Sequence, residues 1–73
     1  MNYVIAVFSS RTETLSFANI LKRMGVPTMI VQTPKEAGRT CGISVKFGYD
    51  NFTIAKQALL NYRLVSFQGF FIQ

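Results

Sequence analysis

The sequence predicts one small α+β domain. Its 73 residues are enough for a single domain. Two segments place apolar residues at helical spacing, and four others are continuously apolar or alternate between apolar and polar residues as strands do. The resulting order is strand, helix, strand, strand, helix, strand. This is the ferredoxin-like, split βαβ order, which predicts a four-stranded antiparallel sheet with two helices on one face over residues 1–73.

The first half of the chain is expected to form a strand, a helix and a second strand. Residues Tyr3–Phe8 are an uninterrupted apolar run, typical of a central strand covered on both faces. Ser10 and Glu13 have the spacing of a capping box, so a helix is expected to begin there. The apolar stripe of this helix contains Leu15, Phe17, Ala18, Ile20, Leu21 and Met24. Thr28–Gln32 is the expected second strand, and Pro34 ends it because proline lacks an amide hydrogen.

The second half is expected to form a loop, a third strand, a second helix and a fourth strand. Residues 33–40 have loop composition. The third strand alternates a buried set with a solvated set, namely Ile43, Val45 and Phe47 with Ser44 and Lys46. Asp50 is the expected N-cap of a helix whose core face is Phe52, Ala55, Leu59 and Tyr62. A strand-like pattern then starts at Leu64, ahead of a closing segment, Gly69–Gln73.

The apolar content predicts self-association. Hydrophobic residues make up 49% of the sequence, including three Tyr and seven Phe. A sheet with helices on one face leaves its other face open, yet the first strand is apolar on both sides. We therefore expect a homo-oligomer, most simply a dimer, in which a second copy covers the open face.

The net charge of +5 raises the question of an acidic partner such as nucleic acid. The eight Lys and Arg residues form no run longer than two, so the sequence contains no basic arm. Residues 42–47 are a poor match to an RNA-binding strand, because Ile43 and Val45 stand where that signature places aromatic residues. Nucleic-acid binding is the least favoured of the functions considered.

Several classes of function are disfavoured by residue content. The sequence has no His and one Cys, so it cannot supply the ligands of a zinc site or form an internal disulfide. Its three carboxylates, on Glu13, Glu36 and Asp50, are far apart in sequence, which disfavours paired acid and base catalysis. We therefore expect no metal, no cofactor and no enzymatic turnover. No secretory signal or membrane span is recognisable, so a soluble cytoplasmic protein is expected.

Cys41 is the residue best suited to covalent chemistry. Lys35 and Arg39 precede it, and nearby cations favour the nucleophilic thiolate. Gly42 follows it and would leave room for a partner's reacting group. The alternative is structural: Cys41 shares parity with Ile43, and a thiol that points into the core would be inert. The residues alone leave both alternatives open.

The segment Cys41-Gly-Ile-Ser-Val-Lys-Phe47 resembles one family, the Se/S carrier-like family of small bacterial proteins. Members are similar in the opening strand, here Val4 to Ser10, and in a proline ahead of the loop, here Pro34. The resemblance covers about residues 3–65 and leaves the closing segment unmatched. It implies that Cys41 carries sulfur or selenium, as a persulfide or selenopersulfide, between a donor enzyme and an acceptor protein.

Two hypotheses about the function follow from the sequence. In the first, the chain is a sulfur or selenium carrier whose Cys41 is the acceptor thiol, with Lys35, Arg39 and Gly42 supporting the thiolate and its access. A lone thiol suits this function, since no second cysteine would resolve the persulfide. In the second, the chain is a non-catalytic interaction module and Cys41 only packs.

Overall fold

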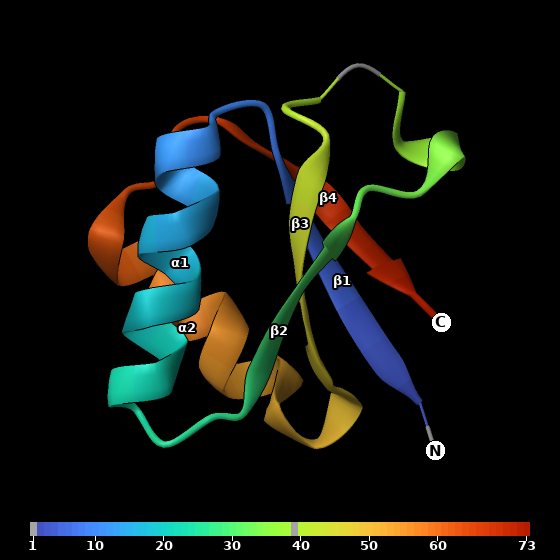
Figure 1. Ribbon diagram of the computed structural model, residues 1–73. Coiled ribbons are helices and arrows are strands. Elements are labelled where there is room, and N and C mark those ends of the chain that lie inside the picture. Colours follow the sequence, from blue (N-terminus) through green and yellow to red (C-terminus); the bar gives the residue numbers. More distant parts are fainter. Residues whose placement is uncertain (1, 39) are drawn as a thin grey trace.

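The computed structural model describes residues 2–38 and 40–73 and shows one four-stranded antiparallel sheet with two α-helices (Figure 1). The elements are β1 (Tyr3–Phe8), α1 (Arg11–Arg23), β2 (Thr28–Gln32), β3 (Ile43–Gly48), α2 (Phe52–Tyr62) and β4 (Phe67–Ile72). Two short 3₁₀ turns, η1 (Lys35–Ala37) and η2 (Tyr49–Asn51), precede β3 and α2. The strand order is β2-β3-β1-β4, which confirms the predicted ferredoxin-like fold. None of the helices in this described part of the chain is long and apolar enough to cross a membrane.

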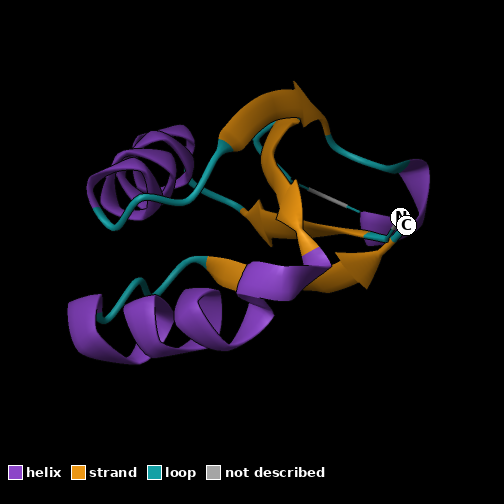
Figure 2. Cartoon of the chain, turned by 90° about the horizontal axis from the view of Figure 1, so that it is seen from below, coloured by secondary structure: helices purple, strands orange, loops and turns teal. Residues whose placement is uncertain are grey.

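The main core lies between the sheet and the helices, both of which cover one side of the strands (Figure 2). Phe8 of the central strand β1 is fully buried, and its ring centroid lies 5.2 Å from that of Phe17 on α1 and 5.4 Å from that of Phe67 on β4. Phe47 and Phe70 continue this set of aromatic contacts with centroids 6.3 Å apart. These aromatic ring contacts link β1, β3 and β4 to one another and to α1 on the helix side of the sheet.

The second face of the sheet is partly covered by the chain itself. Ile5 and Val7 point away from the helix-side core and are nevertheless buried. After the edge strand β2 the chain reaches η1, whose Cα atoms come within 8 Å of those of β4, the opposite edge strand. Figure 2 shows η1 on the side of the strands away from the two long helices. The covering expected from a second copy is thus supplied in part within one chain, and self-association stays a prediction.

The segment from Thr33 to η1 crosses the second face of the sheet, and we call it the crossing segment. It changes the environment of Ser44. We expected this residue on a solvated face, but its side chain is fully buried. The Oγ atom of Ser44 lies 2.7 Å from Oγ1 of Thr33, which begins the crossing segment. A hydroxyl–hydroxyl hydrogen bond satisfies both groups, so burial of Ser44 carries little penalty.

Several predicted details are wrong. Leu15, Met24 and Tyr62 are predicted on helix core faces but are exposed. Leu15 lies beside the buried stripe of α1, whereas Met24 is the C-cap residue of α1 and Tyr62 is the last residue of α2, beyond the packed part of each helix. Asp50 does not cap α2: it lies inside η2, and the helix begins at Phe52 after Asn51, whose side chain makes no capping hydrogen bond.

The fourth strand begins later than expected. α2 ends at Tyr62, its C-cap residue Arg63 is in the left-handed region with φ of 49°, and a turn follows before β4. Val65, predicted as a strand residue, is 88% exposed in this turn. β4 starts at Phe67, so most of the closing segment that the family resemblance left unmatched is an integral strand paired with β1.

Candidate functional site

Cys41 lies immediately before β3, where the chain enters the sheet beside the start of α1. Its side chain is half-buried. The Sγ atom lies 3.4 Å from Oγ1 of Thr14 on α1 and 3.4 Å from the carbonyl oxygen of Ile43. The thiol therefore faces the helix side, as its parity with Ile43 predicted, but it sits at the edge of the core rather than inside it.

Thr14 provides a hydroxyl partner for the thiol. It is fully buried, and its Oγ1 donates to the carbonyl oxygen of Ser10 at 2.9 Å. A neutral Cys41 can donate its hydrogen to Thr14 Oγ1 or to the Ile43 carbonyl. A thiolate has no hydrogen to donate, and the Thr14 hydroxyl can then rotate to donate to sulfur. The Ser10 carbonyl keeps the backbone hydrogen bond from Thr14 N at 3.0 Å, so this rotation leaves no buried acceptor unpaired.

The sequence reasoning missed Thr14, although a signal was present. Thr14, Phe17, Ala18 and Leu21 follow the i, i+3, i+4, i+7 pattern of a buried helix face. A hydroxyl at the first position of that buried stripe needs hydrogen-bond partners, of which the Ser10 carbonyl is the local one. Cys41 supplies one that only the tertiary structure identifies.

Gly42 keeps the space beside the thiol open. Its φ is +92°, and apart from Gly42 itself and its two chain neighbours, no described residue has an atom within 4 Å of the position that a Cβ would occupy. Its amide donates to Oγ1 of Thr40 at 3.1 Å, which holds the bend just before β3. The positive φ explains why glycine occupies this bend, and the approach of a partner to Cys41 stays a prediction.

We expect Gly42→Ala to destabilise the domain by about 1–2 kcal/mol, because L-residues rarely adopt this backbone conformation. Gly48→Ala is the matched control: Gly48 has φ of −70° and similarly open space around the Cβ position, so its replacement should change stability little. Urea unfolding of both variants measures the difference. Equal stability of the two variants would contradict a conformational requirement at Gly42.

Of the two cations predicted to support the thiolate, Lys35 lies away from it. Lys35 is exposed on η1, which lies beside β4 on the face away from the helices, whereas the Cys41 thiol faces α1. Arg39 lies outside the described residues. Within the described part of the chain, the sulfur contacts the Ile43 carbonyl and the hydroxyl of Thr14, and of these only the hydroxyl can donate a hydrogen bond to sulfur. Thr14 lies at the start of α1, where the helix dipole also favours an anion.

Glu13, next to Thr14, connects this end of α1 to the segment before β4. Ser10 Oγ accepts from the Glu13 amide at 3.2 Å, which is one half of the predicted capping box. The Glu13 carboxylate does not complete the box but accepts from Ser66 Oγ at 2.6 Å and Ser66 N at 2.8 Å. Hydrogen bonds from the Ser66 side chain, and then from its backbone, hold the pKa of Glu13 below its ordinary value of 4.5.

Glu13→Gln is expected to make the domain less sensitive to acid. Because the folded protein lowers the pKa of Glu13, the unfolded chain takes up this proton more readily. The stabilisation is complete above the ordinary pKa and is lost as pH falls through the lowered one. Urea unfolding near neutral pH and at about pH 3 should therefore show a smaller acid-induced loss for Glu13→Gln than for the native chain. Ser66→Ala should behave similarly, and the same loss in all three proteins would contradict this assignment.

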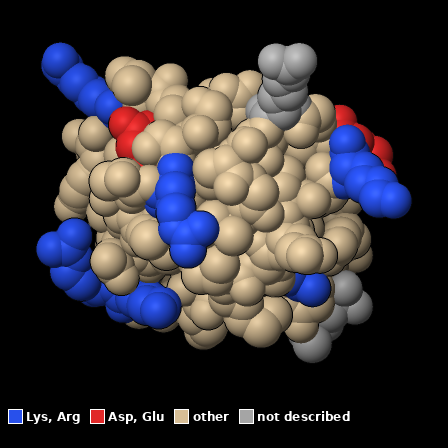
Figure 3. All heavy atoms as spheres, turned by 45° about the horizontal axis from the view of Figure 1, so that its top comes forward, with Lys and Arg blue, Asp and Glu red and all other residues tan. Residues whose placement is uncertain are grey.

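The charged side chains do not form a continuous basic surface on the face shown in Figure 3. Lys and Arg atoms appear there as separate groups with wide uncharged areas between them. This distribution does not favour nucleic-acid binding on that face, because backbone recognition depends on several neighbouring cations.

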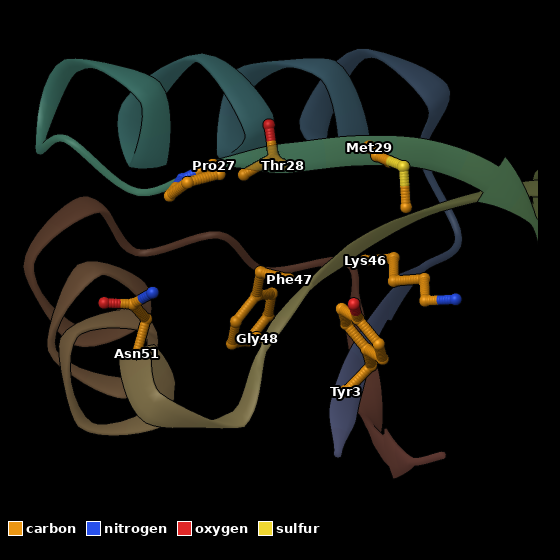
Figure 4. A pocket seen from close by; sticks show the side chains of 8 residues that line it. All are labelled: Tyr3, Pro27, Thr28, Met29, Lys46, Phe47, Gly48 and Asn51. Atoms are coloured by element: carbon orange, nitrogen blue, oxygen red, sulfur yellow. The ribbon is translucent and has the colours of Figure 1, made fainter. Parts of the chain in front are cut away.

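A pocket of about 330 Å³ lies at the other end of β3 from Cys41. It is lined by Tyr3, Pro27, Thr28, Met29, Lys46, Phe47, Gly48 and Asn51 (Figure 4). The Lys46 ammonium lies 4.6 Å from the centroid of the Tyr3 ring. The Thr28 hydroxyl points toward α1, away from Lys46 and Tyr3, so the polar groups of this pocket do not converge on one point.

Comparison with known proteins adds one finding to this geometry. No curated protein and no solved structure matches the chain. The family described as "Putative Se/S carrier protein-like" matches residues 3–71, which include both Cys41 and the strand β4. The match extends beyond the region in which the sequence alone showed a resemblance. With nearly its whole length matched, the chain belongs to the Se/S carrier protein-like family.

Proposed function

We propose that this protein carries sulfur or selenium on Cys41. The observation that supports this most strongly is the placement of the thiol: it is half-buried at the edge of the core, with a buried hydroxyl 3.4 Å from sulfur. A core cysteine would be closed to a partner, and a fully exposed one would lack a fixed hydrogen-bond partner. Membership of a family named for Se/S carriage agrees with this chemistry.

The transfer is a thiol exchange that needs no external oxidant. The Cys41 thiolate attacks the terminal sulfur of a persulfide on the donor enzyme. A new S–S bond forms between Cys41 Sγ and that sulfur, the donor's S–S bond breaks, and the donor leaves as a thiolate. The terminal hydrogen travels with the transferred sulfur. An acceptor thiolate removes the atom by the same step in reverse, and selenium follows the same scheme.

Two features of the chain suit a carrier more than an enzyme. Cys41 is the only cysteine in the sequence, so no intramolecular thiol can displace the carried atom. Gly42 leaves the approach to Cys41 free of a side chain. The Thr14 hydroxyl can donate to the thiolate both before loading and after unloading.

Transfer of radioactive sulfur from a cysteine desulfurase tests the proposal. The native protein should acquire label that dithiothreitol releases, and Cys41→Ser should acquire none. Backbone amide spectra of Cys41→Ser establish that the variant is folded. Equal labelling of both proteins, or no labelling of the native chain, would reject Cys41 as the carrier residue.

A further inference from the structure

A second concave surface lies between the C-terminal half of α2, the segment that follows it and the start of β4. It has a volume of about 400 Å³ and is lined by Lys56, Leu59, Leu60, Leu64 and Phe67. We call it the α2–β4 groove. Leu60 on its rim is 74% exposed, and Val65, next to Leu64 in the chain, is 88% exposed. Large apolar side chains this exposed around one concave surface are typical of a protein-binding site.

The charges that α2 and its C-cap residue bring to the α2–β4 groove are positive. Lys56 is the one charged residue of α2, and Arg63 follows the helix directly. Of the carboxylates, Asp50 precedes α2, at the end of the helix away from Leu60, and Glu36 lies in η1. Glu13 accepts two hydrogen bonds from Ser66. An apolar groove with cations beside it complements a segment that combines apolar and acidic side chains.

We propose that the α2–β4 groove binds an acidic amphipathic helix of a partner protein. Apolar residues on one face of such a helix would enter the groove between Leu60 and Phe67, and its carboxylates would meet Lys56 and Arg63. A second copy of this chain is a poor occupant. A two-fold contact through this surface would place the Lys56 and Arg63 side chains of both copies close together, and like charges oppose such a contact.

A series of contacts connects the α2–β4 groove to the candidate carrier site. Ser66, adjacent to the groove residue Phe67, is hydrogen-bonded to Glu13. The next residue, Thr14, contacts Cys41. A partner held in the groove would therefore lie beside the first turn of α1, on whose other side the thiol is placed. The binding proposal itself does not depend on sulfur carriage by Cys41.

The test uses a synthetic amphipathic peptide with leucine on one helical face and glutamate on the other. Added to the full-length protein, it should shift the methyl resonances of Leu59, Leu60 and Leu64. Leu60→Gln should weaken binding about tenfold, as expected for an apolar anchor. Ile54→Gln is the matched control, because Ile54 is also exposed on α2 but does not line the groove, and its replacement should leave binding unchanged.

Charge reversal separates this partner from others. Lys56→Glu should weaken binding of the glutamate peptide about fivefold and strengthen binding of a peptide with lysine in place of glutamate. Equal binding of both peptides to the native protein, shifts outside the groove, or no shift would overturn the proposal. Concentration-dependent shifts of the same methyl groups without peptide would overturn it in favour of self-association. Binding to anionic vesicles but not to the peptide would overturn it in favour of a membrane surface.

Discussion

Phe8→Ala is expected to destabilise the domain by about 3–5 kcal/mol, the usual cost of removing a buried aromatic ring. Phe8 is fully buried in the central strand, and its ring packs on Phe17 of α1 and Phe67 of β4. Removing the Phe8 ring would leave a cavity between β1, α1 and β4, and these elements would have to move toward one another to fill it. A chain of this length has about 4–11 kcal/mol of total stability, so the variant should be close to unfolding at room temperature.

Urea unfolding followed by circular dichroism measures this effect, and Leu15→Ala is the control. Leu15 is an exposed apolar residue on α1, so its replacement should cost at most about 0.5 kcal/mol. If the two substitutions cost the same, the aromatic cluster around Phe8 would not be the centre of the core.

Thr14→Val is expected to slow alkylation of Cys41 by iodoacetamide about tenfold at neutral pH. Valine keeps the shape of threonine but removes the hydroxyl that lies 3.4 Å from Sγ. This hydroxyl can donate a hydrogen bond to anionic sulfur, and hydrogen bonds to charged groups are stronger than those between neutral groups, so we expect its loss to slow the reaction. The alkylation rates are measured on the folded protein in the absence of urea.

Thr14→Ser is the control that separates the hydroxyl from packing. Serine retains Oγ and removes one methyl group, so alkylation of Cys41 should stay within a small factor of the native rate. If Thr14→Ser slows the reaction as much as Thr14→Val, packing rather than hydrogen bonding controls the thiol. A native rate in both variants would remove Thr14 from the site.

The fold could be predicted because its determinants are local. The stripe of α1 and the alternation of β3 show the periodicity of their elements, and the short, β-branched apolar run of β1 is typical of a strand covered on both faces. The order of these elements then leaves few arrangements that obey the rules of handedness and pairing. β2 was predicted with its observed bounds because Pro27 and Pro34 lie close to its two ends.

The details that were wrong depend on contacts between distant residues. Glu13 has the spacing of a capping box, but its carboxylate bonds to Ser66, 53 positions further along the chain. Ser44 was expected in solvent because no local pattern shows that the chain after β2 crosses the sheet and places Thr33 against it. Val65 has strand-like neighbours, but the same hydrogen bonds to Ser66 hold this segment as a turn.

The candidate site was predictable in part for the same reason. A single cysteine followed by glycine marks Cys41 and Gly42 in the sequence itself. The partner of the thiol comes from another element, 27 positions away, so spacing could not identify Thr14. Proximity in sequence suggested Lys35 instead, which the fold places on the other side of the sheet.

We predict that Cys41 accepts one sulfur atom while the domain is folded. Intact-mass spectrometry under native conditions tests it directly, after incubation with a small-molecule persulfide and removal of excess reagent. We predict one added sulfur on the native protein, its loss on treatment with dithiothreitol, and no addition to Cys41→Ser. Absence of the adduct until the protein is unfolded, or the same adduct on Cys41→Ser, would contradict the claim.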